Sequence, residues 1–369
     1  MVDAEHRLLQ DMGHTVLRYQ RSNAELAQQT GLKTATQALW NRQTTREIAL
    51  YCANFQPDLI HVHNTFPLIS PAFIHFAAAQ QIPVVQTLHN FRLLCAQAML
   101  LREGQDCQSC IGHLPWRAII HRCYHASLSQ SLIAAGVICL HRRLATYQDK
   151  VAQFIVPSQF CRDKFIVGGL PKDRLQVKAH FSHPPAAQQC ARQGGLYVGR
   201  LAPEKGLTVL SNALNDCPDV TMRLAGSGPQ EDIVRERFGA HYLGPLNRTA
   251  ILAWMHGVRY MVAPSICLET FGMSLIEAFS CATPVIASRH GAYAELIRDG
   301  QTGLLFTPGD AQDLAEKIRW AENHPHAMQA MGDAARLDYE KNYTPQMNYQ
   351  RLMEIYESAL GKYRAPQSH

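Results

Sequence analysis

The stretch from Met261 to Ser288, MVAPSICLETFGMSLIEAFSCATPVIAS, places two glutamates, Glu269 and Glu277, eight positions apart around a central glycine. The apolar residues 260–263 predict a buried parallel strand, and residues 274–279 predict the start of a helix. Glu269 is therefore expected in the loop after a strand, and Glu277 in the first turns of the helix that follows. In an open α/β sheet, ligands bind at this edge, where the carboxyl end of a strand meets the positive end of a helix.

The two glutamates have side chains suited to holding sugars, because a carboxylate can accept hydrogen bonds from two neighbouring hydroxyl groups. We expect Glu269 to hold the hydroxyls of a sugar, and Glu277, one helix turn deeper, to hold a ribose. Between them, the backbone N–H groups of Phe271, Gly272 and Met273 would face phosphate oxygens. The alternative is an ordinary loop residue and an ordinary helix residue, which the Thr-Phe-Gly sequence between them disfavours.

Segments that predict strands alternate with segments that predict helices in two blocks of the chain. This alternation predicts two doubly wound parallel sheets, one in each block. The expected domains are residues 1–183, a linker at 184–194, a second domain at 195–344 and a terminal helix at 345–369. The expected strands are 15–19, 59–62, 84–87 and 154–157 in the first block, and 195–198, 221–225, the region of Tyr242, 260–263, 285–287 and 303–306 in the second.

The chain opens on a predicted helix at residues 3–12, with Gly13 as its C-cap, and no predicted strand precedes it. A doubly wound fold normally begins with a strand that lies centrally in its sheet. We therefore expect the first strand to be missing, either because the true protein begins upstream or because this copy is impaired.

The composition is that of a soluble globular protein, with 47% apolar and 18% charged residues over 369 positions. No apolar run has the length of a membrane-spanning helix, and charged residues interrupt the region where a secretory signal would lie. Eleven cysteines without such a signal favour reduced thiols or a metal site in a cytoplasmic protein. Residues 1–185 carry 18 Lys and Arg against 11 Asp and Glu, whereas residues 186–369 carry 17 against 19. The basic first half favours an anionic lipid or substrate, and nucleic acid is disfavoured because no basic run is interleaved with stacking aromatics.

Two loops of the second block have residues suited to phosphate. Arg200 and Lys205 follow the first strand of this block, and Gly206 lies just before a helix. Two cations near a helix N-terminus make a diphosphate site, although a solvated charged loop has the same composition. Gly226 and Gly228 follow the next strand, where glycines permit either the close approach of a ligand or a simple turn.

Histidines end two predicted strands of the first block. His63 is followed by Asn64, and His89 is followed by Asn90. Because parallel strands end at one edge of a sheet, both histidines are expected at the edge that faces an interdomain cleft. A lone histidine is more often structural than catalytic, but two at matching strand ends favour a site.

Four cysteines, Cys95, Cys107, Cys110 and Cys123, have the spacing C-x11-C-x2-C-x12-C. This pattern is similar to a four-thiolate structural zinc site, which would hold together an insertion spanning residues 95–123. Four small buried residues, or an accident of spacing, would give the same pattern, and the sequence does not separate these alternatives.

The segment from Pro115 to Arg143 mixes large apolar residues with arginines. A basic amphipathic segment of this kind can lie on an anionic membrane, which would place the protein peripherally at the inner face of a membrane. A helix that packs on the core and exposes a charged face is the more common explanation.

Because of these motifs, the chain resembles the retaining nucleotide-sugar glycosyltransferases of family 4, also known as glycosyl transferases group 1. The resemblance covers nearly the whole second half and is highly specific, whereas the first half matches more loosely. The matching segments of the second half are 199–206, 226–228, 242–246, 264–288, 291–296 and 299–305. Those of the first half are 13–14, 61–63, 87–89 and 156–160.

The resemblance implies the GT-B architecture, in which two doubly wound, Rossmann-like domains face a cleft and a C-terminal helix crosses back to the first domain. It implies that residues 195–344 bind the nucleotide sugar and that the first domain lies on the acceptor side. The implied catalytic residues are His89, Arg200, Lys205 and Glu269. The implied donor-binding residues are Gly226, Gly228, Leu246, Phe271, Gly272, Met273, Ser274 and Glu277, and the acceptor-side residues are His63, Asn64 and Asn90.

The leading hypothesis is a retaining, metal-independent hexosyltransferase, because cations and a helix N-terminus can offset the charge of the leaving group without a metal. It would move a sugar from a UDP- or GDP-sugar to a glycan or lipid-linked glycan in cell-surface polysaccharide or glycolipid biosynthesis. Members of the family usually begin with a strand and a glycine-rich loop, which are absent here. A sugar-nucleotide-binding or interaction protein without turnover is therefore the alternative. An NAD-dependent oxidoreductase is disfavoured, because no Gly-x-Gly-x-x-Gly with an acidic partner is present.

Overall fold

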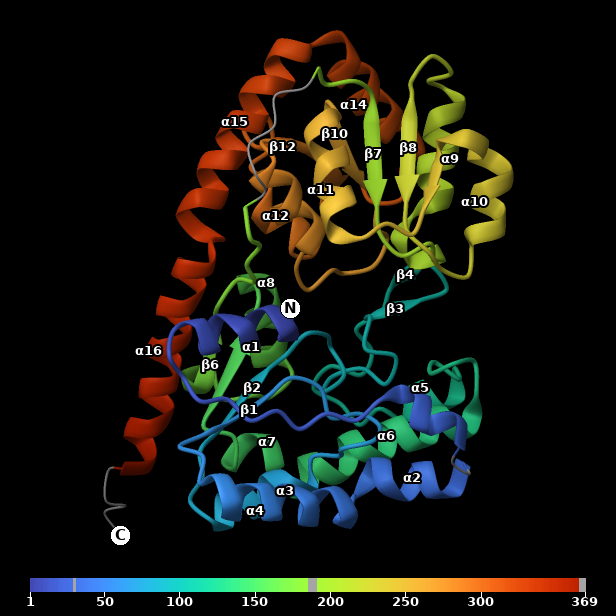
Figure 1. The fold of residues 1–369 in the computed structure, drawn as a ribbon. Helices are drawn as coiled ribbons and strands as arrows, with labels where there is room; N and C mark the ends of the chain where they lie inside the picture. The colour runs from blue at the N-terminus through green and yellow to red at the C-terminus, as the bar shows by residue number, and fades with distance from the viewer. Residues whose placement is uncertain (29–30, 185–190, 365–369) are drawn as a thin grey trace. The chain divides into compact units, whose positions relative to one another are not determined.

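The computed structural model describes residues 1–28, 31–184 and 191–364. The chain divides into two compact units, which are described separately. Unit 1 comprises residues 1–102, 107–178 and 349–369, and unit 2 comprises residues 103–106 and 179–348. Each unit holds a parallel β-sheet with helices packed on it, which confirms the predicted α/β class (Figure 1).

Unit 1 is built on four parallel strands in the order β1–β2–β5–β6. These strands are β1 (Ile60–Val62), β2 (Val84–Thr87), β5 (Gln153–Val156) and β6 (Leu175–Val177). Val85 and Ile155, on the two central strands, share one buried cluster with Leu9 of α1 (Val2–Asp11). Leu352 and Ile355 of the last helix, α16 (Pro345–Arg364), belong to the same cluster. The end of the chain therefore helps to cover the sheet on which its beginning is packed.

The remaining elements of unit 1 are helices that connect or flank these strands, together with the short strand β3. The helices are η1 (Asn23–Gln28), α2 (Gly31–Leu39), α3 (Arg42–Phe55), α4 (Ala72–Ala79), α5 (Trp116–Ile120), α6 (Leu128–Arg143), α7 (Thr146–Asp149), α8 (Gln159–Val167) and η2 (Lys172–Arg174). A short hairpin is formed by β3 (Leu101–Arg102) and β4 (Gln105–Asp106), and β4 lies within residues 103–106, which are assigned to unit 2.

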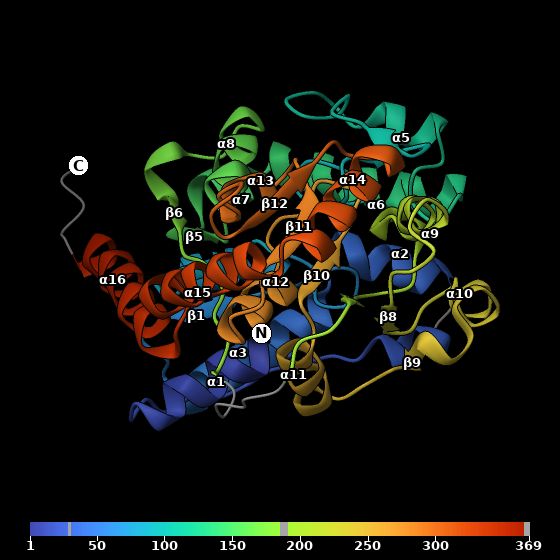
Figure 2. The same cartoon turned by 90° about the horizontal axis from the view of Figure 1, so that it is seen from above.

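Unit 2 is built on six parallel strands in the order β12–β11–β10–β7–β8–β9. Figure 1 shows β7 and β8 side by side and pointing the same way. Figure 2 shows β10, β11 and β12 one after another across the sheet. The strands are β7 (Gly195–Val198), β8 (Met222–Ala225), β9 (Tyr242–Gly244), β10 (Tyr260–Ala263), β11 (Val285–Ser288) and β12 (Gly303–Phe306). The helices are η3 (Pro203–Lys205), α9 (Leu207–Asn215), α10 (Glu231–Phe238), η4 (Gly239–His241), α11 (Arg248–Gly257), α12 (Met273–Ser280), α13 (Tyr293–Leu296), α14 (Ala311–Asn323) and α15 (Pro325–Asn342).

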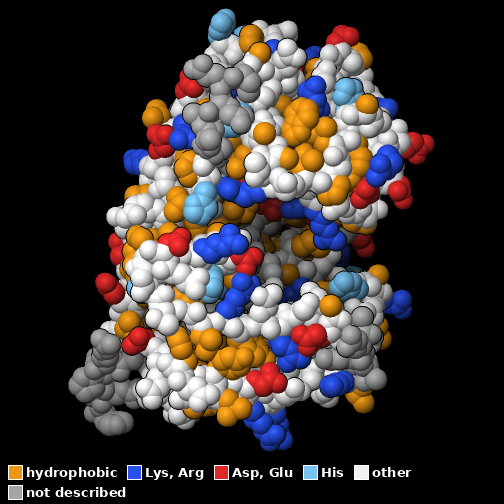
Figure 3. All heavy atoms as spheres, viewed as in Figure 1, with side chains coloured by type: hydrophobic (Ala, Val, Ile, Leu, Met, Phe, Trp, Pro, Cys, Tyr) orange, Lys and Arg blue, Asp and Glu red, His pale blue; other side chains and the backbone are white. Residues whose placement is uncertain are grey.

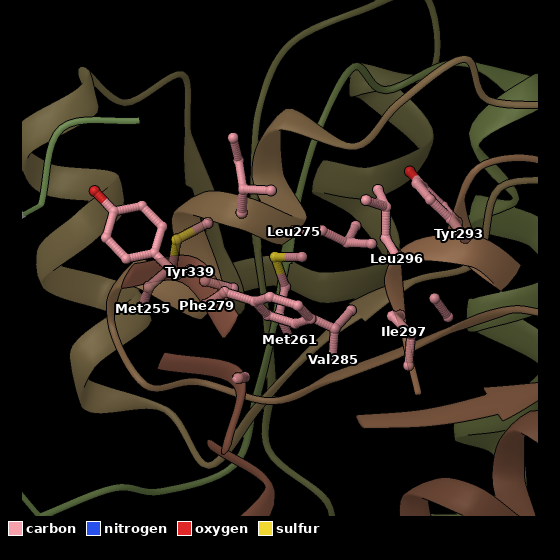
Figure 4. Close-up of a cluster of buried hydrophobic side chains, with 14 of the residues drawn as sticks. Met255, Met261, Leu275, Phe279, Val285, Tyr293, Leu296, Ile297 and Tyr339 are labelled. Carbon is pink, nitrogen blue, oxygen red and sulfur yellow. The ribbon is translucent and has the colours of Figure 1, made fainter. Parts of the chain in front are cut away.

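The sheet of unit 2 has a hydrophobic core on each face, because its strands are buried on both sides. On one face, Met261 of β10 and Val285 of β11 point toward Phe279 of α12 (Figure 4). On the other face, Val262 and Ile286 pack with residues of α9 and α14. Alternate residues of β10 and β11 thus enter opposite cores, as the two-residue period of a strand requires.

The strands predicted for unit 2 all form, and those at 195–198, 260–263 and 303–306 match to the residue. In unit 1, the prediction of a strand at residues 15–19 is wrong, since the described chain has no strand there. The segment has the alternating pattern of a strand but makes no backbone ladder, and side chains hold it instead. His14 Nε2 lies 2.8 Å from the hydroxyl of Tyr349, and the hydroxyl of Tyr19 donates to Glu47 Oε2 at 2.5 Å. The strand β6 and the hairpin β3–β4 were not predicted, because strands of two or three residues carry too little pattern.

Within the described residues, no helix is both long enough and apolar enough to span a bilayer. Figure 3 shows charged side chains spread among hydrophobic ones over the face that it draws.

Candidate functional site

The strand order of unit 2 reverses between β7 and β10. From β7 the chain proceeds to β8 and β9 on one side, and from β10 it proceeds to β11 and β12 on the other. In an open α/β sheet, such a reversal creates a crevice at the carboxyl ends of the two strands, and ligands bind there. The loops at 199–206 and 264–272, in which the sequence predicts cations and a glutamate, leave the sheet at this point.

The structure joins two of the predicted site residues in an ion pair. Lys205 Nζ donates to Glu269 Oε1 at 2.6 Å, and the hydroxyl of Ser265 donates to the same oxygen at 2.7 Å. Burial alone would lower the pKa of the Lys205 ammonium, but the negative charge and hydrogen bond of Glu269 outweigh it and raise that pKa. A cation and a carboxylate are therefore held side by side, with the lysine side chain 29% exposed.

A backbone contact that only glycine permits brings the two loops together. Gly206 has a φ of 73°, and a Cβ atom at this position would lie 1.8 Å from the carbonyl oxygen of Pro264. The N–H of Ile266 donates to the carbonyl of Glu204 at 3.0 Å, and Ser265 Oγ lies 3.1 Å from the same carbonyl oxygen. These contacts position Lys205, one residue before Gly206, beside the loop that carries Glu269.

Gly226 and Gly228 serve a similar packing function in the loop after β8. Cβ atoms at these positions would lie 1.9 Å from the carbonyl oxygen of Gly199 and 2.4 Å from that of Leu201. The N–H of Leu201 donates to the carbonyl of Ser227 at 2.9 Å. The two glycines therefore allow the loop after β8 to pack on the loop after β7.

Glu277 lies on α12 and is paired with an arginine that sequence reasoning missed. Arg248 Nε donates to Glu277 Oε1 at 3.1 Å, and Arg248 Nη2 donates to Ser182 Oγ at 2.6 Å. Burial raises the pKa of the Glu277 carboxyl, and Arg248 partly opposes this shift. Arg248 opens α11 shortly after Leu246, and nothing in its local sequence indicates a partner 29 positions away.

The start of α12 lies between the two glutamates, as predicted. Gly272 is its N-cap and makes no side-chain capping hydrogen bond, and Met273 and Ser274 form the first turn. The positive end of this helix therefore faces the crevice at the end of β10. Arg200 pairs with Glu204, at 3.7 Å from Nη1 to Oε1, and its side chain is 65% exposed.

In unit 1, the two predicted histidines meet at the carboxyl ends of β1 and β2. His63 Nδ1 lies 2.9 Å from His89 Nε2, and the two rings are stacked. Burial lowers the pKa of His63 to about 3 and that of His89 to about 4, so both imidazoles are neutral near neutral pH. Both histidines line a cavity of unit 1, together with Asn64, Asn90 and other residues of the neighbouring loops.

Behind these histidines lies a buried ion pair that the sequence did not predict. Lys178 Nζ lies 2.9 Å from Glu5 Oε2, and both residues are 3% exposed. Burial alone would raise the pKa of Glu5, but Lys178 and then the neighbouring histidines outweigh it and hold that pKa far below its ordinary value. Glu5 Oε1 lies 3.3 Å from His61 Nδ1 and 3.5 Å from His63 Nε2.

The four cysteines of the predicted zinc site all lie in unit 1, and Cys107 directly follows the hairpin β3–β4. Among the described residues, only Glu5, His61 and His63 offer three or more ligand atoms within 4.8 Å of one another. The thiols are close enough to act on one another: burial and then Cys95 and Cys110 raise the pKa of Cys123 to about 11. The structure thus brings the cysteines into one neighbourhood but does not gather their sulfurs into a ligand shell.

The basic amphipathic segment of unit 1 forms α5 and α6, and both helices expose large apolar side chains. Four of these are more than half exposed: Trp116 (54%), Ile120 (63%), Leu128 (54%) and Leu132 (56%). The opposite side of α6 is buried through Ala134, Ala135 and Ile138. The helix therefore packs on the core, as the ordinary explanation predicts, and also carries an exposed apolar surface.

Two family models match the chain, one in each half. "Glycosyl transferases group 1" matches residues 195–338, and "Glycosyltransferase Family 4" matches residues 5–178. The first of these ranges contains the crevice of unit 2, and the second contains Glu5, the two histidines and Lys178.

Similar proteins include enzymes named for sugar transfer. A glycogen synthase of Mycobacterium tuberculosis is 26% identical over 85% of this chain and 72% of its own length. The sulfoquinovosyl transferase SQD2 of Arabidopsis thaliana is 24% identical over 86% of this chain and 60% of its own length. The crystal structure of Anabaena Alr3699/HepE in complex with UDP has the same fold, with a TM-score of 0.65 and 21% identity over 85% of this chain and 82% of that one.

The contact between Gly206 and Pro264 predicts an unusually large cost for adding one methyl group. We expect Gly206→Ala to lower the free energy of unfolding by more than the 1–2 kcal/mol, roughly, that a positive φ alone costs a non-glycine residue, because its Cβ also overlaps backbone. Urea unfolding followed by circular dichroism measures this loss. Gly300→Ala is the matched control, since Gly300 has a φ of 72° but no atom within 4 Å of its would-be Cβ. Equal losses in the two variants would contradict the steric argument.

Proposed function

We propose that this chain, which belongs to the glycosyltransferases of group 1 and family 4 and has the GT-B fold, transfers a sugar from a UDP- or GDP-sugar to a hydroxyl group, with retention of the anomeric configuration. The acceptor is a glycan or lipid-linked glycan of cell-surface polysaccharide or glycolipid biosynthesis. The observation that carries this proposal is the Lys205–Glu269 pair at the carboxyl ends of β7 and β10. The Anabaena protein of the same fold was crystallised in complex with UDP, which supports UDP as the first nucleotide to test.

The crevice of unit 2 holds both a cation, Lys205, and a carboxylate, Glu269, and the proposed reaction needs one of each. Lys205 and the positive end of α12 would offset the negative charge that develops on the departing diphosphate. Glu269 would accept hydrogen bonds from hydroxyls of the donor sugar, and Glu277 from hydroxyls of the ribose. Arg200 is exposed in the same loop as Lys205 and would supply a second cation to the diphosphate. These groups provide the charge stabilisation for which other transferases use a metal, and we therefore propose a metal-independent reaction.

Retention follows from attack on the face that the leaving group vacates. The bond between the anomeric carbon and the phosphate oxygen breaks, and a bond from that carbon to the acceptor oxygen forms on the same face. The proton of the acceptor hydroxyl passes to the departing phosphate oxygen. His89, which lines the cavity of unit 1, would hydrogen-bond to the transferred sugar, and His63, Asn64 and Asn90 would lie on the acceptor side.

Removing either member of the ion pair tests the function. We expect Lys205→Ala and Glu269→Ala each to lower the rate of nucleotide release from the productive donor about a hundredfold or more, because each removes a charge that stabilises the transition state. The measurement is nucleotide release from a panel of UDP- and GDP-sugars, with and without acceptor glycans. Lys317→Ala and Glu231→Ala, which break partly exposed ion pairs of unit 2, are the matched controls and should retain full activity.

Two outcomes would contradict the proposal in different ways. Unchanged turnover in both ion-pair variants would show that the crevice of unit 2 is not the donor site. Donor binding by the unaltered chain without any turnover would instead favour the alternative, a sugar-nucleotide-binding protein.

We also propose that α5 and α6 rest on an anionic lipid surface, which would bring the enzyme to a lipid-linked acceptor. The exposed apolar side chains of this region are accompanied by the exposed residues Arg117, Arg122 and Arg143. No acidic residue occurs between Asp106 and Asp149, so no carboxylate of this segment opposes an anionic headgroup. Apolar side chains with arginines around them suit the boundary between headgroups and acyl chains.

Vesicle binding tests this surface. The chain is expected to co-sediment with vesicles containing phosphatidylglycerol, less so in high salt, and not with vesicles of phosphatidylcholine alone. Arg117→Gln with Arg122→Gln should weaken binding about thirtyfold, at roughly 1 kcal/mol for each arginine. Ile120→Ser should also weaken it, whereas Leu337→Ser, on an equally exposed leucine of α15, should not. Binding that is indifferent to lipid charge would contradict the proposal.

We propose finally that Cys95, Cys107, Cys110 and Cys123 hold a structural zinc ion, whose binding would draw the four sulfurs together. Four cysteines in one neighbourhood, with one of them directly after a hairpin, are typical of such sites. Metal analysis of protein purified under reducing conditions without chelators is expected to find about one zinc ion per chain. Cys110→Ser should lose it, and Cys52→Ser, at a cysteine on α3, should keep it. Metal-free protein would contradict this proposal.

A further inference from the structure

A continuous row of polar groups runs through the interior of unit 1, from Lys178 to Glu5, His63 and His89. The first distance is 2.9 Å, from Lys178 Nζ to Glu5 Oε2. The second is 3.5 Å, from Glu5 Oε1 to His63 Nε2, and the third is 2.9 Å, from His63 Nδ1 to His89 Nε2. The row begins at a pair of buried charges and ends at a histidine that lines the cavity.

Four segments of the chain build this row, and its last member, His89, follows β2. α1 supplies Glu5, the end of β1 supplies His61 and His63, and Lys178 directly follows β6. His61 and His63 lie on the same side of β1, because side chains two residues apart on a strand point the same way. Both histidines thus reach the carboxylate of Glu5.

The carboxylate needs a proton donor from one of these histidines. Oε2 of Glu5 is bonded to Lys178, whereas Oε1 is buried and has no hydrogen-bond partner among the described residues. An ionised oxygen in this position is costly unless an N–H points at it. The two ring nitrogens of His61 already have partners, at 2.7 Å from the hydroxyl of Tyr356 and 2.8 Å from that of Thr87. The remaining nitrogen near Glu5 is Nε2 of His63.

A neutral imidazole carries one N–H and one nitrogen lone pair. The position of the proton on the His63 ring therefore determines the position of the proton on the His89 ring. If Nε2 of His63 carries its proton toward Glu5, then Nδ1 of His63 is an acceptor. Nε2 of His89 must then carry a proton and donate it to that acceptor at 2.9 Å. Nδ1 of His89 consequently carries a lone pair.

We propose that Glu5, held in place by Lys178, is a positioning residue that fixes the tautomers of both His63 and His89, so that His89 acts toward its ligand as a hydrogen-bond acceptor. A hydroxyl of the donor sugar or of the acceptor would then donate to His89. This last step rests on the proposed function, whereas the tautomers themselves do not.

The same residues do not suit a metal ion. Glu5, His61 and His63 offer three ligand atoms within 4.8 Å of one another. However, a cation there would lie close to the ammonium group of Lys178, which is 2.9 Å from the carboxylate that would bind it. It would also displace the hydroxyl of Tyr356 from Nδ1 of His61, the ring nitrogen that faces Glu5. A hydrogen bond from Nε2 of His63 to Glu5 would leave all of these contacts intact.

Glu5→Gln is expected to reverse the tautomers. The amide oxygen of glutamine takes the hydrogen bond from Lys178, and its NH2 group then faces Nε2 of His63. That nitrogen becomes the acceptor, the proton of His63 moves to Nδ1, and Nε2 of His89 becomes an acceptor in turn. Nδ1 of His89 then carries a proton and repels a donating hydroxyl.

The tautomers are measured by NMR of the full chain labelled with 15N-histidine. In the unaltered chain, Nδ1 of His89 is expected at the chemical shift of a nonprotonated ring nitrogen and Nε2 at that of a protonated one. Glu5→Gln should exchange these two assignments, and Glu47→Gln, at a glutamate of α3 that is bonded to Tyr19, should leave them unchanged. A protonated Nδ1 in the unaltered chain, or the same tautomer in Glu5→Gln, would overturn the proposal.

A second variant keeps the test decisive if Glu5→Gln fails to fold. His63→Phe retains the Glu5–Lys178 pair but removes the link to His89. His89 should then lose the tautomer that His63 imposes, and the proposal is wrong if both ring nitrogens of His89 keep the chemical shifts of the unaltered chain. A metal ion that purifies with the unaltered chain and is lost with Glu5→Gln would also overturn it.

Activity gives a separate outcome. On the productive donor, Glu5→Gln is expected to lower kcat about ten- to a hundredfold, which corresponds to a lone pair that no longer accepts from a hydroxyl. Reversed tautomers with unchanged kcat would refute the step that involves the ligand and leave the donor site of unit 2 untouched. Unchanged activity in both Lys205→Ala and Glu269→Ala, with His89 in the expected tautomer, would instead refute the donor site of unit 2 and leave the tautomers untouched.

Discussion

The approach of Gly206 to Pro264 is the contact on which the crevice of unit 2 depends. It brings the loop after β7 against the loop after β10 at the point where the strand order reverses. Lys205 and Glu269 come from these two loops and are 64 positions apart, so their ion pair exists only because the backbones meet. Gly226 and Gly228 extend the same principle to the loop after β8. Small residues at strand ends thus permit the close loop packing that places large charged ones.

Unit 1 depends on a different constraint, the burial of opposite charges. Glu5 and Lys178 are both almost inaccessible to solvent, and each would be destabilising without the other. Their pairing ties α1 to the end of β6 and leaves one carboxylate oxygen facing two histidines. The same interaction therefore joins the first helix to the sheet and sets the electrostatic surroundings of the cavity. The Glu5–Lys178 pair is therefore needed both for the stability of unit 1 and for the position of the charge beside its histidines.

Local patterns predicted the elements well where they were long and buried. The apolar run at 260–263 and the glycine before α12 were sufficient to place Glu269 in a loop and Glu277 on a helix. Patterns failed where pairing decides the structure: residues 15–19 alternate like a strand but have no strand beside them. Glu5 and Lys178 could not be paired from the sequence, because they lie 173 positions apart and nothing local marks either one. Arg248 was missed as a partner of Glu277 for the same reason.

The sequence by itself determined the fold class, the strands of unit 2 and the residue types at the end of each strand, because periodicity and glycine preferences act over a few residues. Only the tertiary structure decided which of these residues touch. It paired Lys205 with Glu269 and His63 with His89, gave Gly226 and Gly228 a packing function, and paired Arg200 with Glu204. It also revealed Glu5 behind the histidines. Ion pairs and tautomers depend on distances of about 3 Å between distant segments, and such distances arise only when the sheets assemble.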